Sequence, residues 1–399
     1  MRTRVHRVAA AACACAALAL APTASAQDDW SVKWSNGHQI SSKDKQFSLK
    51  FGGRIQADYT FVSEDPELTG DVEGDGFEFR RARVFFEGTI YERVKFKAQY
   101  DFAGAGDPTF KDVWIGITSD AGLLQFGHFK EPFSLEELTS SKYLAFLERS
   151  LPVEAFAPSR NAGVGFSGGS DSVNYGVGAF YDTDDFGVST NEDNVNVTGR
   201  VAFRPVWEED GARMVHLGIA AHNRDRGDGG SLRFRARPEA HFSGRFVDTG
   251  NFPAESATIL GGEVAGVFGP FWFAGEYITA DVDAPVVGDP SFDGAYVQAG
   301  YYITGEHRRY KGSSGAFDRQ KPRNNFGSDG GSGAWEVVGR YSTIDLTDAR
   351  VDGGEQDDIS VGLNWYLNPA TRMMLNYVMA DVDRVGEADF ILLRWQVDF

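Results

Sequence analysis

Apolar and polar residues alternate along runs of about ten residues through most of the chain, and this pattern constrains the fold most. Counted back by twos from Phe399, the last run places one set of side chains on one face: Ile391, Leu393, Trp395 and Val397. Arg394, Gln396 and Asp398 fall on the other face. Tilted strands of roughly this length cross a bilayer with one lipid-facing and one wet face. The alternation therefore predicts an all-β fold, a transmembrane antiparallel β-barrel.

A soluble β-sandwich also has alternating strands, so composition and export are needed to choose. The chain holds 47 Gly, 31 Phe, 14 Tyr and 8 Trp, yet no run is apolar enough for a membrane helix. Many aromatic residues without an apolar run are typical of a transmembrane barrel, where only alternate residues face lipid. A terminal aromatic residue at Phe399 also resembles the insertion signal of outer-membrane barrels.

The N-terminus has the three parts of a secretory signal peptide. A basic start precedes the apolar run Val8 to Ala21, and Ala24–Ala26 is a small-residue cleavage motif. Cys13 and Cys15 lie too early in this run for a lipoprotein cleavage site, and the mature chain would have no cysteine for a disulfide. We therefore expect a signal peptide at 1–26, a short periplasmic segment at 27–46 and a barrel domain at 47–399.

The number of strands follows from parity. Seventeen segments alternate: 47–62, 77–90, 93–103, 109–118, 122–128, 162–167, 171–181, 194–205, 213–223, 231–242, 257–268, 271–281, 294–304, 334–345, 357–367, 371–381 and 388–399. Bacterial single-chain barrels normally have an even number of strands. Counting in from both ends makes 224–256 one external loop, the fifth, so 231–242 is excluded and a 16-stranded barrel remains. The same count leaves two other long connections, the third external loop at 129–161 and a periplasmic one at 305–333.

Acidic and basic residues separate along the chain. The net charge is −18, which excludes a basic nucleic-acid stripe, and acidic residues concentrate in predicted external loops such as 182–193 and 281–293. Basic residues recur instead on the second and third strands and in the fifth loop. Arg233, Arg235 and Arg237 have period two, so in an extended chain all three point one way. Because Arg on a lipid face is costly, we expect these residues to face the lumen.

The third loop and its flanks carry a long motif, QFGHFKEPFSLEELTSSKYLAFLERSLPVEAFAPSRNAGVGF, from Gln125 to Phe166. It resembles the hallmark region of the phosphate-selective porin O and P family. Shorter segments are similar in the same order: FGGRIQADYTF (51–61), FRRARVFFEG (79–88), KAQYDFA (97–103), KDVWIGI (111–117) and TGEHRRYKG (304–312). The resemblance covers roughly 47–399.

The resemblance implies a homotrimer of 16-stranded barrels in outer-membrane lipid, with the three long connections folded into the lumen. It implies passive passage of phosphate, polyphosphate or other small anions along an arginine ladder to a central lysine. Matching positions are Arg80, Arg81, Arg233, Arg235 and Arg237 for the ladder, Lys142 for the central lysine, Lys130 for the basic lining and Asp112 for the acidic partner near the constriction. The family pattern makes Asp112 the carboxylate nearest to Lys142. The alternative is that Lys142 only holds the loop by pairing with Glu136, Glu137 or Glu148. Leu135 is a candidate for a position where some members have a tyrosine.

Other functions leave weaker traces. Gly163-x-Gly165-x-x-Gly168 fits a dinucleotide-binding pattern in letters only, because no helix follows it. The sequence has no zinc motif, P-loop or nucleophile elbow, so we expect no cofactor, no metal and no enzyme. A general or other-solute porin on the same scaffold is the main alternative, and a barrel enzyme or surface adhesin is the more distant one.

Overall fold

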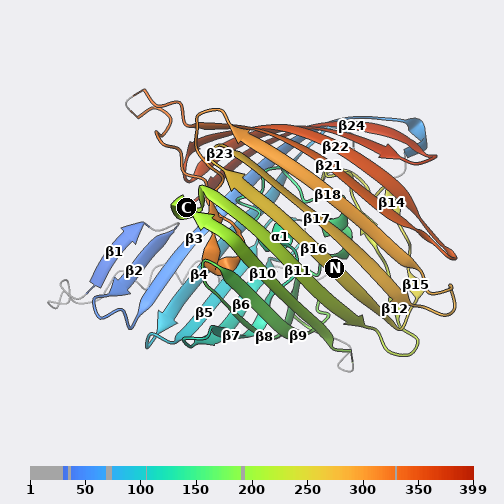
Figure 1. Ribbon diagram of the computed structural model, residues 1–399, viewed down its shortest axis with the longest axis horizontal. Coiled ribbons are helices and arrows are strands. Elements are labelled where there is room, and N and C mark those ends of the chain that lie inside the picture. The colour runs from blue at the N-terminus through green and yellow to red at the C-terminus, as the bar shows by residue number, and fades with distance from the viewer. Residues whose placement is uncertain (1–29, 35–36, 69–73, 105, 190–193, 329) are drawn as a thin grey trace, which may run out of the picture.

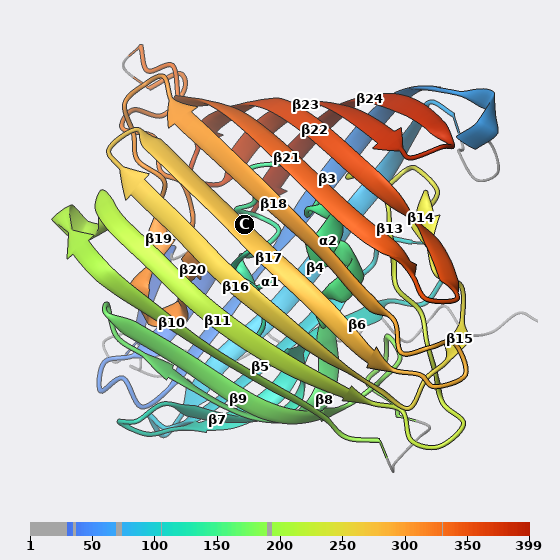
Figure 2. The same cartoon turned by 45° about the vertical axis from the view of Figure 1, so that its right-hand side comes forward.

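The computed structural model describes residues 30–34, 37–68, 74–104, 106–189, 194–328 and 330–399, and in it sixteen antiparallel strands close into one barrel (Figures 1 and 2). The barrel strands are β3 (Ser48–Glu64), β4 (Gly76–Ile90), β5 (Val94–Asp101), β6 (Thr109–Thr118), β7 (Leu123–Lys130), β8 (Arg160–Gly169), β9 (Val173–Tyr181), β10 (Asn196–Glu208), β11 (Arg213–Asp225), β16 (Ser256–Phe268), β17 (Phe271–Asp283), β18 (Ser291–Tyr302), β21 (Ala334–Asp348), β22 (Val351–Asn368), β23 (Thr371–Val382) and β24 (Gly386–Asp398). The predicted fold class and strand number are confirmed.

The last strand closes the barrel on the first. β24 pairs antiparallel with β3, with Ile391 opposite Phe61 and Trp395 opposite Ala57. The N–H of Gly53 donates to the carbonyl of Phe399 at 2.7 Å. Closure leaves every strand paired on both sides, which a sheet in hydrocarbon requires. The predicted parity holds here, since Trp395 is 55% exposed on the outer face and Arg394 2% exposed on the inner face.

A hairpin precedes the barrel. Strands β1 (Trp30–Trp34) and β2 (His38–Ser42) pair with each other, and β2 pairs with the start of β3, so the hairpin extends the sheet beyond the barrel rim (Figure 1). The expected signal peptide lies outside the described residues. In the part of the chain that the structure describes, no helix is both long and apolar enough to cross a membrane.

Three long connections contain most of the remaining short helices and strands. Residues 131–159 contain α1 (Leu135–Leu138) and α2 (Leu151–Phe156). The other short elements are β12 (Ser231–Leu232), β13 (Arg235–Ala236), β14 (Val247–Asp248) and β15 (Phe252–Pro253) in 226–255, β19 (Tyr310–Lys311), η3 (Gly312–Ser314) and β20 (Ala316–Phe317) in 303–333, and η1 (Pro66–Leu68) and η2 (Glu209–Gly211) elsewhere. The segment from Leu232 to Arg237 pairs only within its own loop, as the parity argument predicts.

The third loop packs against the inner wall of the barrel. Phe133 and Leu151 are fully buried in one cluster with Ile278 of β17. The wall has glycines, which lack side chains, where the loop lies. A Cβ at Gly176 would be 2.8 Å from the ring of Pro132, and one at Gly261 would be 3.1 Å from the ring of Phe133. The glycines therefore let the loop pack closely against the wall, and the open lumen lies on the other side of the loop.

Candidate functional site

A cavity of about 860 Å³ lies inside the barrel between the third loop and the strands β3 to β8. Twelve Lys and Arg line it against six Asp and Glu, although the chain as a whole is strongly acidic. The basic residues are Lys50, Arg54, Arg80, Arg81, Arg83, Lys97, Lys111, Lys130, Lys142, Arg149, Arg160 and Lys311; the acidic ones are Glu87, Asp112, Glu137, Asp184, Asp185 and Asp318. The lumen is therefore a basic compartment in an acidic protein.

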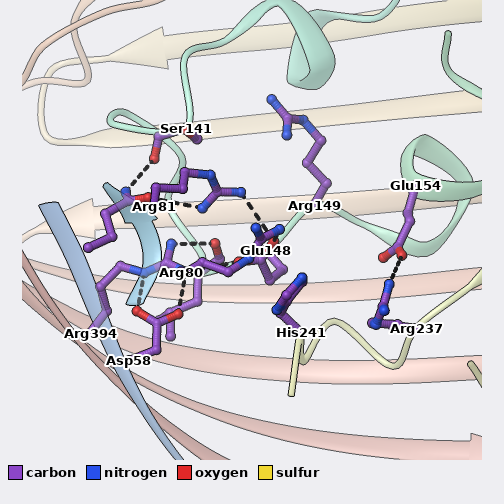
Figure 3. A network of polar contacts seen from close by, with 12 residues as sticks. Asp58, Arg80, Arg81, Ser141, Glu148, Arg149, Glu154, Arg237, His241 and Arg394 are labelled. Carbon is purple, nitrogen blue, oxygen red and sulfur yellow. Dashed lines mark hydrogen bonds and ion pairs between the residues drawn. The ribbon is translucent and has the colours of Figure 1, made fainter. Parts of the chain in front are cut away.

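Single carboxylates are shared by several cations. Glu148 of the third loop accepts from Arg80 at 2.9 Å, from Arg81 at 3.4 Å and from Arg394 at 2.9 Å (Figure 3). Arg394 also pairs with Asp58 at 2.6 Å. This network fixes the loop against β4 and β24 and turns Arg80 and Arg81 toward the cavity. Two carboxylates for three guanidinium groups leave an excess of positive charge.

Two further carboxylates bridge pairs of cations on the other side of the cavity. Asp112 of β6 lies between Lys97 and Arg160, at 2.8 Å from each. Glu137 of α1 pairs with Lys130 at 3.0 Å and with Arg149 of the third loop at 2.7 Å. Asp112 is thus an acidic partner inside the basic lining, as the resemblance implies, but it contacts different cations from those expected.

Lys142 and Arg54 lie where the third loop meets β3. Arg54 is 6% exposed, donates to the Ser141 hydroxyl at 2.7 Å and has no carboxylate partner among the described residues. Lys142 pairs with Asp398 of β24 at 3.4 Å and lies 5.3 Å from the ring centroid of Tyr143. Burial lowers the pKa of the Lys142 ammonium to about 7, and Arg54 adds to the shift while Asp398 opposes it.

The expected partners of Lys142 were wrong. We expected Asp112 near it, or a structural pair with Glu136, Glu137 or Glu148. The structure pairs these four carboxylates with other arginines or lysines and gives Lys142 the carboxylate of Asp398. Sequence reasoning missed this pair because the two residues are 256 positions apart and meet only when the barrel closes.

The fifth loop forms a second pocket of about 450 Å³, on the external side of the first. Leu232, Phe234 and Ala236 are buried against the wall, so the alternate residues Arg233, Arg235 and Arg237 face this pocket. His241, Arg245, Glu78 and Asp248 also line it. The single orientation of the three arginines follows the predicted period of two.

Carboxylates offset the mutual repulsion of the three parallel guanidinium groups. Arg233 pairs with Asp248 at 2.5 Å, and Arg237 pairs with Glu154 of α2 at 3.4 Å (Figure 3). Arg235, between them, has no ion pair in the described part of the chain. Neighbouring carboxylates therefore hold the outer two arginines in place and leave the central one available.

Arg340 of β21 anchors both external loops that fold inward. Its guanidinium donates to Glu239 of the fifth loop at 2.8 Å and, from the third loop, to Glu136 and the Glu148 carbonyl, each at 3.2 Å. A second contact to Glu239 completes its five N–H donors. The side chain is buried and lies 4.3 Å from the ring of Phe146. One residue thus fixes the positions of both loops.

All eight candidate site residues line one of the two cavities: Arg80, Arg81, Asp112, Lys130 and Lys142 the first, and Arg233, Arg235 and Arg237 the second. Leu135 is fully buried and lines neither, whereas Tyr143 lines the first. Residues that sequence reasoning did not select include Arg54, Lys111, Arg149, Arg160 and Arg245. Arg54 could have been found from its wet-face parity, and Arg149 and Arg160 from their place in the third-loop motif.

Comparison with known sequences gives one consistent result. The profile of the family described as phosphate-selective porin O and P matches residues 49–399. Porin O of Pseudomonas aeruginosa is 30% identical over 401 residues, which cover 90% of this chain and 88% of that protein. An uncharacterized protein of Caulobacter vibrioides is also 30% identical, over 95% of this chain and 79% of its own length.

Solved structures resemble the chain in fold. The trimer form of OmpT, an outer membrane protein of Vibrio cholerae, superposes with a TM-score of 0.55 at 12% identity and covers 88% of this chain and 99% of its own. The outer membrane channel DcaP of Acinetobacter baumannii gives a TM-score of 0.52 at 11% identity, over 90% and 99% of the two chains. At these identities the likeness concerns the barrel architecture alone.

Proposed function

The chain belongs to the phosphate-selective porin O and P family and is an outer-membrane porin, and we propose that its pore selects anions and passes phosphate or polyphosphate by passive diffusion. The observation that carries the proposal is the lining of the main cavity, where Lys and Arg outnumber Asp and Glu two to one in an acidic chain. A water-filled passage between low-dielectric walls concentrates ions of the opposite charge to its lining.

The residue types suit a strongly hydrated oxyanion. A guanidinium group presents paired, planar N–H donors that match two oxygens of phosphate, whereas lysine offers a compact charge. Arg235 in the outer pocket and Arg54 in the main cavity have no carboxylate partner within the described ranges, so both are free to bind an anion. We propose that an anion moves from the outer pocket to the Arg54 and Lys142 region in steps between such groups.

The shared carboxylates keep the anion from being trapped. A unit charge pair at ~4 Å is worth about 4 kcal/mol at an effective dielectric of 20, so several bare cations at one point would hold phosphate too tightly for conduction. Glu148, Asp112 and Glu137 each draw on two or more cations and lower the local field. In this proposal the eight candidate site residues form a graded path rather than one deep site.

We also propose that the porin is a homotrimer, as the family resemblance implies; the trimer form of the structurally similar OmpT is compatible with this. A general porin is the second candidate, favoured by Asp184 and Asp185, which add negative charge to the lining at the external loop between β9 and β10. Such residues would let small cations enter beside anions.

Planar-bilayer recording tests the choice. Under a KCl gradient we expect a reversal potential on the anion side, and added inorganic phosphate should reduce the chloride current with saturation. A reversal potential near zero together with an unchanged current in phosphate would support the general porin instead.

A further inference from the structure

A third cavity, of about 650 Å³, adjoins the main cavity on the side of β7, β8 and β9, and we call it the chamber. Six residues line both spaces and so mark their junction: Gln125, Phe129, Lys130, Leu138, Lys311 and Ser314. The far walls come from the short turn between β6 and β7, the paired ends of β8 and β9, and η3 of the periplasmic connection. The chamber therefore lies beside the conducting path, toward the periplasmic turns.

The chamber differs from the main cavity in chemistry. Glycines form much of its wall, and Asp120 is its one carboxylate. Phe129 and Leu138 add apolar surface at the junction, and Pro132 adds it inside the chamber. Its glycines are Gly122, Gly165, Gly168, Gly169 and Gly176. A pocket of this volume with apolar walls and a few polar groups is of the size that encloses a small organic molecule.

Three donor groups that line the chamber have no partner among the described residues. Lys95 of β5 and Lys311 of β19 make no ion pair within the ranges that the structure describes. The amide nitrogen of Asn174, a residue only 5% exposed, has no hydrogen-bond partner there. Of these three groups Asn174 is buried, and a buried donor without an acceptor is costly, so a ligand that supplies acceptor oxygens would be favoured.

We propose that the chamber receives the organic part of a small phosphate ester while the phosphate group rests at the junction, near Lys130 and Lys311. The inference rests on the proposed function and adds a substrate class to it. Inorganic phosphate has no apolar part and would use the main cavity alone. An ester would gain contacts with Phe129 and Leu138 and hydrogen bonds from Asn174.

The test compares block of the chloride current by inorganic phosphate and by 4-nitrophenyl phosphate, whose nitro group carries acceptor oxygens, using the purified full-length porin in planar bilayers. We expect 4-nitrophenyl phosphate to block at about a hundredfold lower concentration, since nine added non-hydrogen atoms at ~0.3 kcal/mol each give roughly that factor. Two variants change only the chamber. Ser167→Trp fills it, and Lys95→Gln removes an unpaired cation.

Both variants should weaken 4-nitrophenyl phosphate block by about five- to tenfold and leave inorganic phosphate block unchanged. Ser167→Ala, which keeps the space, and Lys43→Gln, which removes an exposed turn charge, are the matched controls and should behave as wild type. Equal block by the two probes in the wild type, or equal loss of both in Ser167→Trp and Lys95→Gln, would overturn the chamber proposal. Failure of inorganic phosphate alone to block would count against the proposed phosphate specificity and leave the chamber result readable.

Discussion

Anion preference should fall as the pH rises through about 7, because Lys142 loses its charge there. Burial lowers its pKa to about 7, and a lysine with that pKa is about 90% charged at pH 6 and about 10% charged at pH 8. Lys142 lies in the third loop and lines the main cavity, so an anion passing Arg54 feels this charge at short range. Anion preference falls rather than rises with pH because a lysine is cationic below its pKa and neutral above it.

The size of the effect can be bounded. A unit charge at ~4 Å contributes about 1 kcal/mol in bulk water and about 4 kcal/mol at an effective dielectric of 20. The lumen is wet, so we take the lower figure. Because the charge attracts chloride and repels potassium by about this amount each, the loss of ~0.8 charge between pH 6 and pH 8 changes the chloride-to-potassium permeability ratio roughly fifteenfold. Chloride is the probe of choice because phosphate itself changes charge near neutral pH.

The assay is the KCl reversal potential in planar bilayers at pH steps between 5.5 and 8.5. Lys142→Arg keeps its charge over this range and should stay at the low-pH value, whereas Lys142→Gln should stay at the high-pH value. His128, His241 and Lys111 also line the cavities. Both variants retain them, so any change they cause appears equally in both variants and is subtracted as the baseline. A step of full size in Lys142→Arg would refute the assignment to Lys142.

Three further outcomes are expected. Replacing Arg233, Arg235 and Arg237 together with Ala should weaken phosphate block and anion preference with the barrel still folded; unchanged block would exclude the fifth loop from the path. Lys142→Glu should move the reversal potential further toward cations than Lys142→Gln does, because it places a second carboxylate beside Asp398; a mutant that kept its anion preference and lost only thermal stability would mark Lys142 as structural. Gly176→Ala should destabilise the folded barrel by about 1–3 kcal/mol, measured by heat-induced loss of the folded band on gels, since its Cβ meets Pro132; an unchanged transition would contradict the close packing of the third loop.

The sequence was sufficient for the strands because each strand of a barrel buries one parity and exposes the other. It also predicted that Arg233, Arg235 and Arg237 face the lumen, since the alternate residues Leu232 and Phe234 are apolar and are buried against the barrel wall. Parity gives the face of a residue but not its height or its cross-barrel neighbour. For that reason the pairing of Lys142 with Asp398 and the sharing of Glu148 by three arginines could not be predicted. They depend on how a long loop lies inside a closed ring of strands.

The five hydrogen bonds of Arg340 have a consequence for how this pore can change over time. Because one guanidinium group binds both the third and the fifth loop, a substitution at Glu239 changes the effect that a later substitution at Glu136 has on the pore. We therefore expect the sequences of the two loops to change together during evolution. Exchanging the third loop with that of a relative should preserve a narrow pore only when the fifth loop and Arg340 are exchanged with it.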